Sequence, residues 1–401
     1  MSFGELAQEL KPKERIQSLS FTEAMAYLCT KLSYRDATNT INRFLYRPSV
    51  DHVKLRTVSD SMQRIGGEIS DALAQSTEHI LKMYGFHPQT GLPEENVRLS
   101  SNIRLPAPQE DTTFPLRKIQ NVVEDINGSR EEKIPFPAED ILIETHPETC
   151  VYVSIDDIGV KRQKDHRKDG SVRSTKHVEN TVAHIQYGEN TYVLSAIGMR
   201  NALKSVLAFL LLNDILQYEL LFLTDGAKDI KSHIEAVFAF HSHAVILDWY
   251  HLKKKCMEYL SMAVKGKEQR NAVLEKLLRY LWVGDVKTAS EYLGGLKPSV
   301  IKNQKWIQEL ISYFERKGKA ITCYAVRAKL NLRNSSNPVE KANDLLVAQR
   351  QKHNGMSWTP HGSGALAAVE MIYQNNQSNL WFQKKELLNF MPVYIHEKFA
   401  A

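Results

Sequence analysis

The sequence has few cysteines and no long hydrophobic run, and these two absences exclude several classes of protein. Only four cysteines occur in 401 residues, and no two of them form a CxxC pair: Cys29, Cys150, Cys256 and Cys323. We therefore expect neither a disulfide framework nor a zinc knuckle, and a reducing cytosol is the simplest compartment. There is no run of about eighteen or more apolar residues, and the N-terminal residues lack the pattern of a secretory signal. We expect a protein that is neither secreted nor membrane-spanning.

The composition is that of a globular protein with a moderate basic bias. Hydrophobic residues make up 43% of the chain and charged residues 24%, so the chain can bury a substantial core in two or three units. The formal net charge of +6 is compatible with a polyanionic partner, although many proteins share it.

The N-terminal residues up to Gly85 have the apolar spacing of helices. We predict helices over 21–31, from Ser33 to Phe44, and over 53–65, an order that resembles a helix-turn-helix. The third helix would then be the recognition helix. Its candidates for contact with DNA are Lys54, Arg56, Thr57, Ser59, Gln63 and Arg64. A plain helical bundle with a solvated basic face is the alternative.

From residue 149 onward the pattern changes to strands. A strand over 151–156 is followed by a hairpin over 178–197, a helix over 202–216, a strand over 220–225, a helix over 228–240 and a strand over 244–248. This is the order of the ribonuclease H fold, a mixed α/β (α+β) sheet in which parallel strands with crossover helices extend an antiparallel meander.

Amphipathic helices then interrupt this fold before its last helix. Residues 252–336 form the predicted all-helical insertion, and Ser336-Asn337-Pro338 begins a helix that runs to about His353 and carries Glu340 in its first turn. The predicted organisation is a helix-turn-helix-like domain over 1–86, a linker over 87–148, a catalytic core over 149–251 and 337–401, and the insertion over 252–336.

Three carboxylates in this pattern can hold two divalent metals over a phosphodiester. Strand alternation puts Asp156 on the face opposite Val151, Val153 and Ile155, at the exit of the first strand. Asp225 ends the second, almost wholly apolar strand, and Glu340 follows far downstream. Carboxylate oxygens suit Mg²⁺ or Mn²⁺, and two such ions serve phosphodiester chemistry.

Four ordered blocks resemble a DDE transposase of a bacterial insertion sequence. They are Ser-Ile-Asp156-Asp-Ile-Gly, Leu-Thr-Asp225-Gly-Ala, Leu-Asp248-Trp-Tyr-His251-Leu and Asn337-Pro-Val-Glu340-Lys-Ala-Asn343. The resemblance covers roughly residues 151–358. It implies metal-dependent cleavage that frees a 3′-hydroxyl at an element end, followed by attack of that hydroxyl on target DNA. It also implies a bacterial, cytoplasmic protein that pairs as a homo-oligomer on DNA.

Each acid has an alternative role. Asp157 could be the ligand in place of its neighbour Asp156, Asp225 could start a turn or cap a helix, and Glu340 could be a capping residue. Asp248 and His251 could form a satisfied buried pair, and we expect them to orient the site or contact DNA. His241 and His243 are read as surface residues rather than metal ligands.

Basic residues near the glutamate are candidates for phosphate contacts. These are Lys341, Arg350 and Lys352, with an exposed basic helix face as the alternative. Trp358 could stack on an extruded base or pack in the core. The lysines of 253–255, 265 and 267 are further candidates for DNA contact. A resolvase-type nuclease of the same fold and a non-catalytic DNA-binding derivative remain alternative functions.

Overall fold

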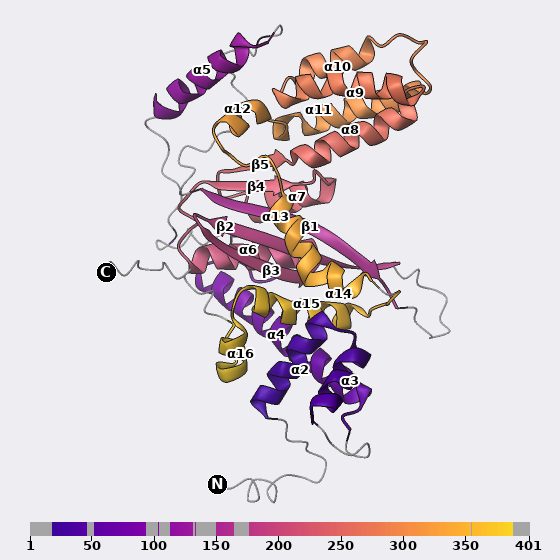
Figure 1. Cartoon of the computed structure of the whole chain (residues 1–401). Coiled ribbons are helices and arrows are strands. Elements are labelled where there is room, and N and C mark those ends of the chain that lie inside the picture. The colour runs from indigo at the N-terminus through magenta and orange to yellow at the C-terminus, as the bar shows by residue number, and fades with distance from the viewer. Residues whose placement is uncertain are drawn as a thin grey trace, which may run out of the picture. The chain divides into compact units, whose positions relative to one another are not determined.

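A computed structural model describes residues 18–45, 52–93, 113–130, 150–163, 176–353 and 355–387, with the single positions 103 and 133. The chain divides into two compact units (Figure 1). The helical unit comprises 1–72, 160–178 and 346–388, and the sheet unit comprises 73–159, 179–345 and 389–401. The domain boundaries expected from the sequence remain predictions. No helix among the described residues is long and apolar enough to cross a membrane.

The centre of the sheet unit is a five-stranded mixed sheet. Its strands are β1, Val151–Lys161; β2, His177–Tyr187; β3, Asn190–Ile197; β4, Leu220–Thr224; and β5, His243–Leu247. Their spatial order is β3-β2-β1-β4-β5, with β2 antiparallel to β3 and with β1, β4 and β5 parallel. This order confirms the mixed, ribonuclease H-like sheet that the sequence predicted.

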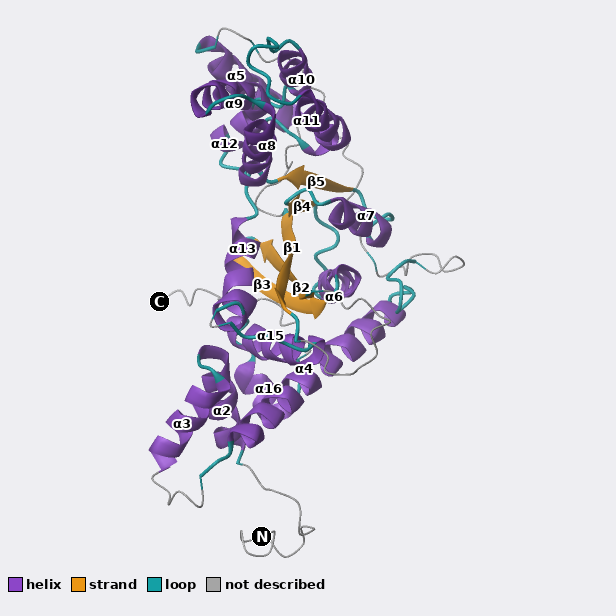
Figure 2. Cartoon of the chain, turned by 90° about the vertical axis from the view of Figure 1, so that its right-hand side faces the viewer, coloured by secondary structure: helices purple, strands orange, loops and turns teal. Residues whose placement is uncertain are grey.

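Helices cover both faces of this sheet. α6, Met199–Leu212, and α7, Lys228–Val237, lie on one face, and α13, Asn337–Asn343, lies on the other (Figure 2). Most of α6 is buried because its sequence is apolar on nearly every side. The hairpin turns at Gly188, whose φ of +57° suits glycine, and Tyr187 pairs with Asn190.

The insertion is built from helices that share one hydrophobic core. It contains α8, Trp249–Ala263; α9, Lys267–Trp282; α10, Val286–Gly294; α11, Gln304–Lys317; the short η2, Gly318–Ala320; and α12, Tyr324–Lys329. A further helix, α5, Thr113–Gly128, lies within the predicted linker. It packs Ile119 and Val123 against Val326 of α12. The sequence reading missed α5 because proline and polar residues surround it.

The helical unit contains α2, Leu19–Lys31; α3, Tyr34–Leu45; the first part of α4, Leu55–Met83; α15, Pro360–Gln374; and α16, Ser378–Lys384. The first two helices match the prediction, but α4 continues far beyond the predicted end at Ile65. Gly66 lies inside this helix rather than at its end. Its missing side chain lets α4 approach α15 closely, because a Cβ there would lie 2.1 Å from the carbonyl oxygen of Ala365.

The helix that carries Glu340 runs without a break to Gln351, close to the predicted end, but it is not α-helical throughout. α13 is followed by a π-helical segment, η3, Asp344–Ala348, and then by α14, Gln349–Gln351. Ser336 precedes the helix as predicted but makes no side-chain capping bond. Its hydroxyl and N–H instead donate to Asp248.

Candidate functional site

Three aspartates occupy one row across the parallel strands. Ser154 on β1 is paired with Leu223 on β4, and Thr224 is paired with Leu247 on β5. The same register, continued, brings Asp156 beside Asp225 and Asp225 beside Asp248. Asp156 is not at the end of its own strand, as we had expected, because β1 continues to Lys161. It lies beside the point where the neighbouring β4 ends, and its carboxylate contacts Asn343 on α13.

Asp156 is half-buried and held by an amide. Asn343 Nδ2 donates a hydrogen bond of 2.9 Å to Asp156 Oδ2. Burial, together with the negative charge of Asp225, raises the pKa of Asp156 to about 6. The two carboxylates therefore repel each other across neighbouring strands, which is a favourable arrangement for binding a cation.

Asp157 makes a different contact from Asp156. Its side chain is exposed, and Oδ1 accepts a hydrogen bond from the hydroxyl of Thr181 on β2. Successive strand residues point to opposite faces of a sheet. The contact of Asp156 with α13 therefore supports Asp156, rather than Asp157, as the member of the candidate site.

Asp225 begins a tight turn, as its alternative role suggested. Its Oδ1 accepts a 2.7 Å bond from the N–H of Ala227, and Gly226 has a φ of +80°. This Asx-type turn fixes the direction of the carboxylate directly after β4. The turn and a site role are compatible, because each carboxylate oxygen has more than one lone pair.

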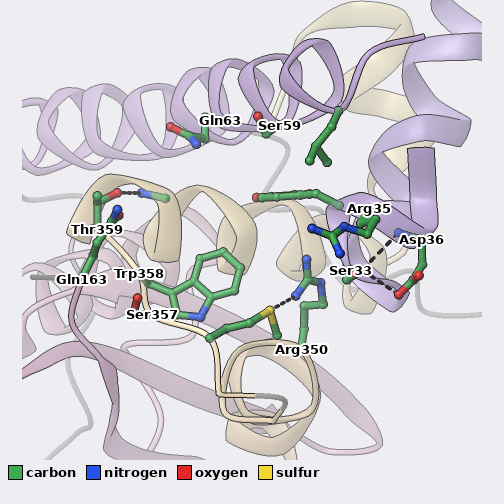
Figure 3. Close-up of a pocket in the computed structure, with 14 residues that line it drawn as sticks. Ser33, Arg35, Asp36, Ser59, Gln63, Gln163, Arg350, Ser357, Trp358 and Thr359 are labelled. Atoms are coloured by element: carbon green, nitrogen blue, oxygen red, sulfur yellow. Dashed lines mark hydrogen bonds between the residues drawn. The ribbon is translucent and has the colours of Figure 1, made fainter. Parts of the chain in front are cut away.

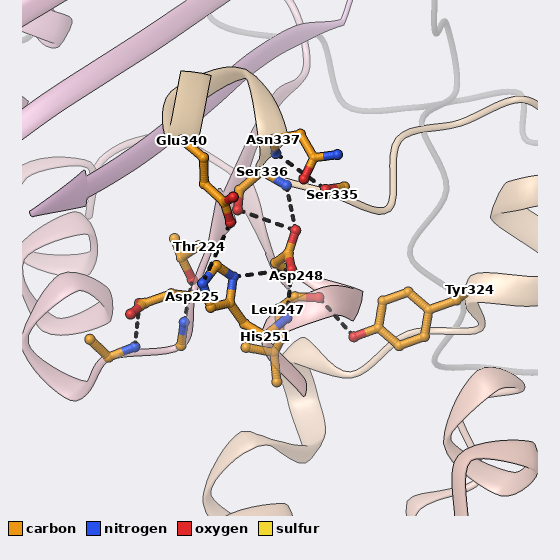
Figure 4. A network of polar contacts seen from close by, with 12 residues as sticks. Thr224, Asp225, Leu247, Asp248, His251, Tyr324, Ser335, Ser336, Asn337 and Glu340 are labelled. Carbon is orange, nitrogen blue, oxygen red and sulfur yellow. Dashed lines mark hydrogen bonds and ion pairs between the residues drawn. The ribbon is translucent and has the colours of Figure 1, made fainter. Parts of the chain in front are cut away.

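A polar network ties Glu340 to the end of β5 (Figure 4). Asp248 is fully buried and accepts from the N–H of His251, whose Nδ1 lies 3.1 Å from the same oxygen, Oδ1. His251 Nε2 lies 3.6 Å from Glu340 Oε1. The second oxygen of Asp248 accepts from Ser336 at the start of α13. One buried carboxylate therefore fixes both the start of the helix and the imidazole that faces Glu340.

The electrostatics of this network favour an ionised Asp248 carboxylate paired with a protonated His251 imidazole. The hydrogen bond to Asp248 raises the pKa of His251 despite partial burial. Burial opposes ionisation of Asp248, yet hydrogen bonds from His251 and Ser336 hold its pKa below the usual range. Asp248 and His251 therefore form the satisfied pair that was the alternative reading, and their role in orienting the site stays a prediction.

Carboxylate and amide oxygens suit a hard divalent cation, although the described residues contain no preformed metal-binding cluster. Among the described residues, no three His, Cys, Asp or Glu side chains are grouped closely enough to hold a metal ion. Glu340 Oε1 and Asn343 Oδ1 are nonetheless buried oxygens without a hydrogen-bonding partner in the described part of the chain. Unsatisfied oxygens beside mutually repelling carboxylates fit a cation that would complete the site.

Several other predicted residues have a structural role. Arg350 is buried, donates from Nε to the carbonyl oxygen of Cys29 at 2.9 Å and lies over the Tyr34 and Trp358 rings, which does not fit its predicted contact with DNA phosphates. Trp358 is buried and donates to the carbonyl oxygen of Gln351, which favours core packing. His241 is also buried, with Nε2 2.8 Å from the carbonyl oxygen of Leu216, and so it is not the surface residue we expected.

The remaining basic candidates lie at the surface. Those exposed include Lys54, Arg56, Arg64, Lys253, Lys254, Lys265, Lys267, Lys341 and Lys352. Arg56 and Arg64 form ion pairs with acids one turn later, Asp60 and Glu68. Gln63 and Lys255 are half-buried, and Lys255 Nζ lies 3.3 Å from Glu258 Oε2.

Asn343 is the site residue that the sequence reading missed. It lies three residues after Glu340, and this spacing places both side chains on one face of α13. The helical period could therefore have identified it. The sequence could not have shown that α11 lies near Asp225. Only the folded insertion brings Tyr313 and Lys317 of α11 close enough to interact electrostatically with that aspartate.

Comparisons with known proteins give only distant structural matches. No family model matches the sequence, and no curated protein matches it significantly. The strand-transfer complex of the Drosophila P element transposase is 11% identical, covers 87% of this chain and 86% of its own, and has a TM-score of 0.22. The Mos1 transposase paired-end complex with the left transposon end is 12% identical, covers 77% and 98%, and has a TM-score of 0.17. The fold assignment rests on the strand order, because these scores are too low to establish it.

Proposed function

We propose that this chain is a DDE transposase that binds the ends of a mobile element and catalyses metal-dependent DNA cleavage and strand transfer. The observation that carries the proposal is the parallel register of β1 and β4, which, continued by two residues, brings Asp156 beside Asp225, the residue that follows β4. Glu340 lies on α13, the same helix that supplies the Asn343 contact to Asp156. This arrangement supports a site formed by three acids from distant parts of the sequence.

Asp156, Asp225 and Glu340 would hold the metal ions, Mg²⁺ or Mn²⁺, which in such sites activate the attacking oxygen and stabilise the leaving one. The other residues orient these three. Asn343 fixes one oxygen of Asp156, the turn at Gly226 directs Asp225, and the Asp248–His251 pair faces Glu340. Water is the first nucleophile in this scheme, and the freed 3′-hydroxyl of the element end is the second.

The exposed basic residues supply candidates for binding DNA. Lys54, Arg56 and Arg64 lie at or after the start of α4, with Gln63 beside them, and Lys341 and Lys352 lie beyond Glu340. Cations of this kind neutralise backbone phosphates and release counterions. Two copies of the chain, one on each element end, would account for joining of both ends.

The experiment that tests the proposal is incubation of the protein with its own element ends and Mg²⁺ or Mn²⁺, followed by mapping of the cleaved phosphates. A transposase yields cleavage at the element terminus and joined products in which that 3′ end is linked to target DNA. Cleavage without joining would identify a nuclease of the same fold. Specific binding without any cleavage would identify a non-catalytic DNA-binding protein.

A further inference from the structure

A pocket of about 850 Å³ in the helical unit has polar side chains that already have partners within the chain. Arg350 Nη1 donates to Met356 Sδ, Ser33 caps α3 and Thr359 caps α15 (Figure 3). This leaves mainly helix N-termini and one exposed arginine, which do not define a binding site. The sheet unit has a better-defined candidate beside Asp225.

Helix α11 brings two polar side chains of the insertion to Asp225. The apolar face of α11 is buried in the core of the insertion, and the helix packs along α8. Tyr313 belongs to this core, which also contains Leu247 at the end of β5. Lys317 follows Tyr313 by four residues, so both side chains lie on one face of the helix.

The hydroxyl of Tyr313 reaches the turn that holds Asp225. A Cβ at Gly226 would lie 3.4 Å from the Tyr313 hydroxyl oxygen, so the glycine leaves room for the tyrosine beside the turn. Tyr313 is only 8% exposed. Its hydroxyl has no hydrogen-bonding partner among the described residues, yet it is not fully enclosed, so a ligand can reach it. An acceptor beside Asp225 would satisfy this hydroxyl.

Lys317 places a positive charge near the same aspartate. It is the half-buried last residue of α11, and it makes no ion pair within the described part of the chain. Its ammonium is attracted by Asp225 and Glu235 and repelled by Lys231 and Arg316. Glu235 is already paired, because its Oε1 lies 3.4 Å from Lys231 Nζ. Three cations and two acids therefore gather at this end of α11, which favours a further anion.

The insertion thus reaches the candidate site from two of its helices. α8 carries His251, which faces Glu340, and α11 carries Tyr313 and Lys317, which lie near Asp225. A hydroxyl and an ammonium on one helix face can bind two oxygens of a single phosphate. Charge-assisted hydrogen bonds of this kind are stronger than neutral ones.

We propose that Tyr313 and Lys317 bind a phosphate of the DNA strand beside Asp225. The hydroxyl donates to one non-bridging oxygen, and the ammonium pairs with another. Both residues bind substrate, so the insertion holds the group on which the site acts. The choice of DNA as the source of this phosphate rests on the proposed function.

The test uses the full chain and element-end DNA. Single-turnover cleavage with Mn²⁺ at saturating DNA gives the rate, and fluorescence anisotropy in Ca²⁺ gives the affinity over a series of salt concentrations. Lys317→Ala should lower the rate about 10–100-fold and reduce the slope of log affinity against log salt by about one. Lys317→Arg keeps the positive charge and should recover most of both losses.

Two further variants separate the phosphate contact from folding and from general basic charge. Tyr313→Phe should lower the rate about fivefold or more and keep the wild-type thermal unfolding midpoint, because the ring stays in the core. Lys319→Ala is the control, because Lys319 is exposed and lies only two residues after Lys317. It should keep the wild-type rate and salt slope.

Wild-type rates and salt slopes in both Tyr313→Phe and Lys317→Ala would overturn the proposal, as would equal losses in Lys317→Ala and Lys319→Ala. Either result leaves the proposed function intact if the wild type cleaves and joins element ends. DNA binding by the wild type without cleavage, with a slope reduced in Lys317→Ala alone, would overturn the proposed function and support the phosphate contact.

Discussion

His251 faces Glu340 across 3.6 Å from its Nε2, while its Nδ1 lies against the buried Asp248. The glutamate lies 89 positions after the histidine in the sequence, yet Asp248 also binds Ser336 at the start of the glutamate's helix. The position of Glu340 therefore depends on a pair of side chains at the end of β5.

Replacement of His251 by alanine should lower the cleavage rate by about 10–100-fold, the usual cost of losing a residue that orients a metal ligand. Cleavage by the wild type and by His251→Ala should be measured over a series of Mn²⁺ concentrations. Partial recovery of the variant at high Mn²⁺ is expected, because Glu340 is still present. A wild-type metal dependence in the variant would contradict a positioning role. His243→Ala, which alters a histidine outside the network, is the control.

The same histidine should make stability depend on pH. Because its pKa is raised in the folded protein, protonated His251 stabilises the fold fully below its ordinary value of 6.5. This contribution is lost as the pH rises through the raised pKa. The difference in free energy of unfolding between wild type and His251→Asn should therefore shrink in urea titrations as the pH rises above about 6.5. A difference that grows over this range would contradict the ion pair with Glu340 and Asp248.

Asp156→Asn should stabilise the metal-free protein at neutral pH while it removes activity. The folded-state pKa of about 6 lies above the ordinary aspartate value of 3.8, so the folded protein binds this proton more tightly than the unfolded chain does. Wild-type stability should fall as the pH rises from about 4 through 6, by up to about 3 kcal/mol from this group. Urea unfolding of both proteins at pH 4 and pH 7.5 measures the effect. A variant less stable than wild type at pH 7.5 would contradict the repulsion between Asp156 and Asp225.

The close approach of α4 to α15 can be tested with two adjacent glycines. Gly66→Ala would place a Cβ 2.1 Å from a backbone oxygen of Ala365, so it should destabilise the protein by about 3 kcal/mol or more. Gly67→Ala meets only the movable His361 ring, at 3.1 Å, and gains up to about 1 kcal/mol of helix propensity. The thermal unfolding midpoints of Gly66→Ala and Gly67→Ala should therefore shift from the wild-type value in opposite directions, or by clearly unequal amounts. Equal shifts would show that the two helices do not cross at Gly66.

The basic stretch at the start of the insertion should contact DNA through two lysines rather than three. Lys253 and Lys254 are exposed, whereas Lys255 lies 3.3 Å from Glu258 and over the Tyr259 ring. Replacing both exposed lysines by alanine should reduce the slope of log affinity against log salt by about two. Lys302→Ala is the control, because Lys302 is also exposed but its backbone N–H donates to Ala263 at the far end of α8. An unchanged slope would indicate that these lysines form a solvated helix face and do not contact DNA.

Strand order and helix order were predictable because they depend on local patterns. Alternation and apolar runs predicted β1 to β5, and the Asn337-Pro338 start predicted the helix of Glu340. The end of β1 was missed, because hydrophobic alternation weakens at Asp156 while the backbone pairing continues.

Features that depend on distant contacts were not predictable in the same way. The tolerance of α4 for Gly66 reflects the α15 backbone beside it, and burial of Arg350 depends on Tyr34 and Trp358 folding around it. The contact between His251 and Glu340 likewise requires the whole insertion to fold between them.

The most direct test of the proposed site compares strand transfer by Asp156→Ala and Asp157→Ala, with element-end DNA and Mn²⁺ in excess. The two residues are adjacent, but Asp156 contacts Asn343 whereas Asp157 contacts Thr181. We expect no joined product from Asp156→Ala and near wild-type product from Asp157→Ala, with both proteins folded and bound to DNA. Full activity of Asp156→Ala together with loss in Asp157→Ala would contradict the site described for Asp156, Asp225 and Glu340.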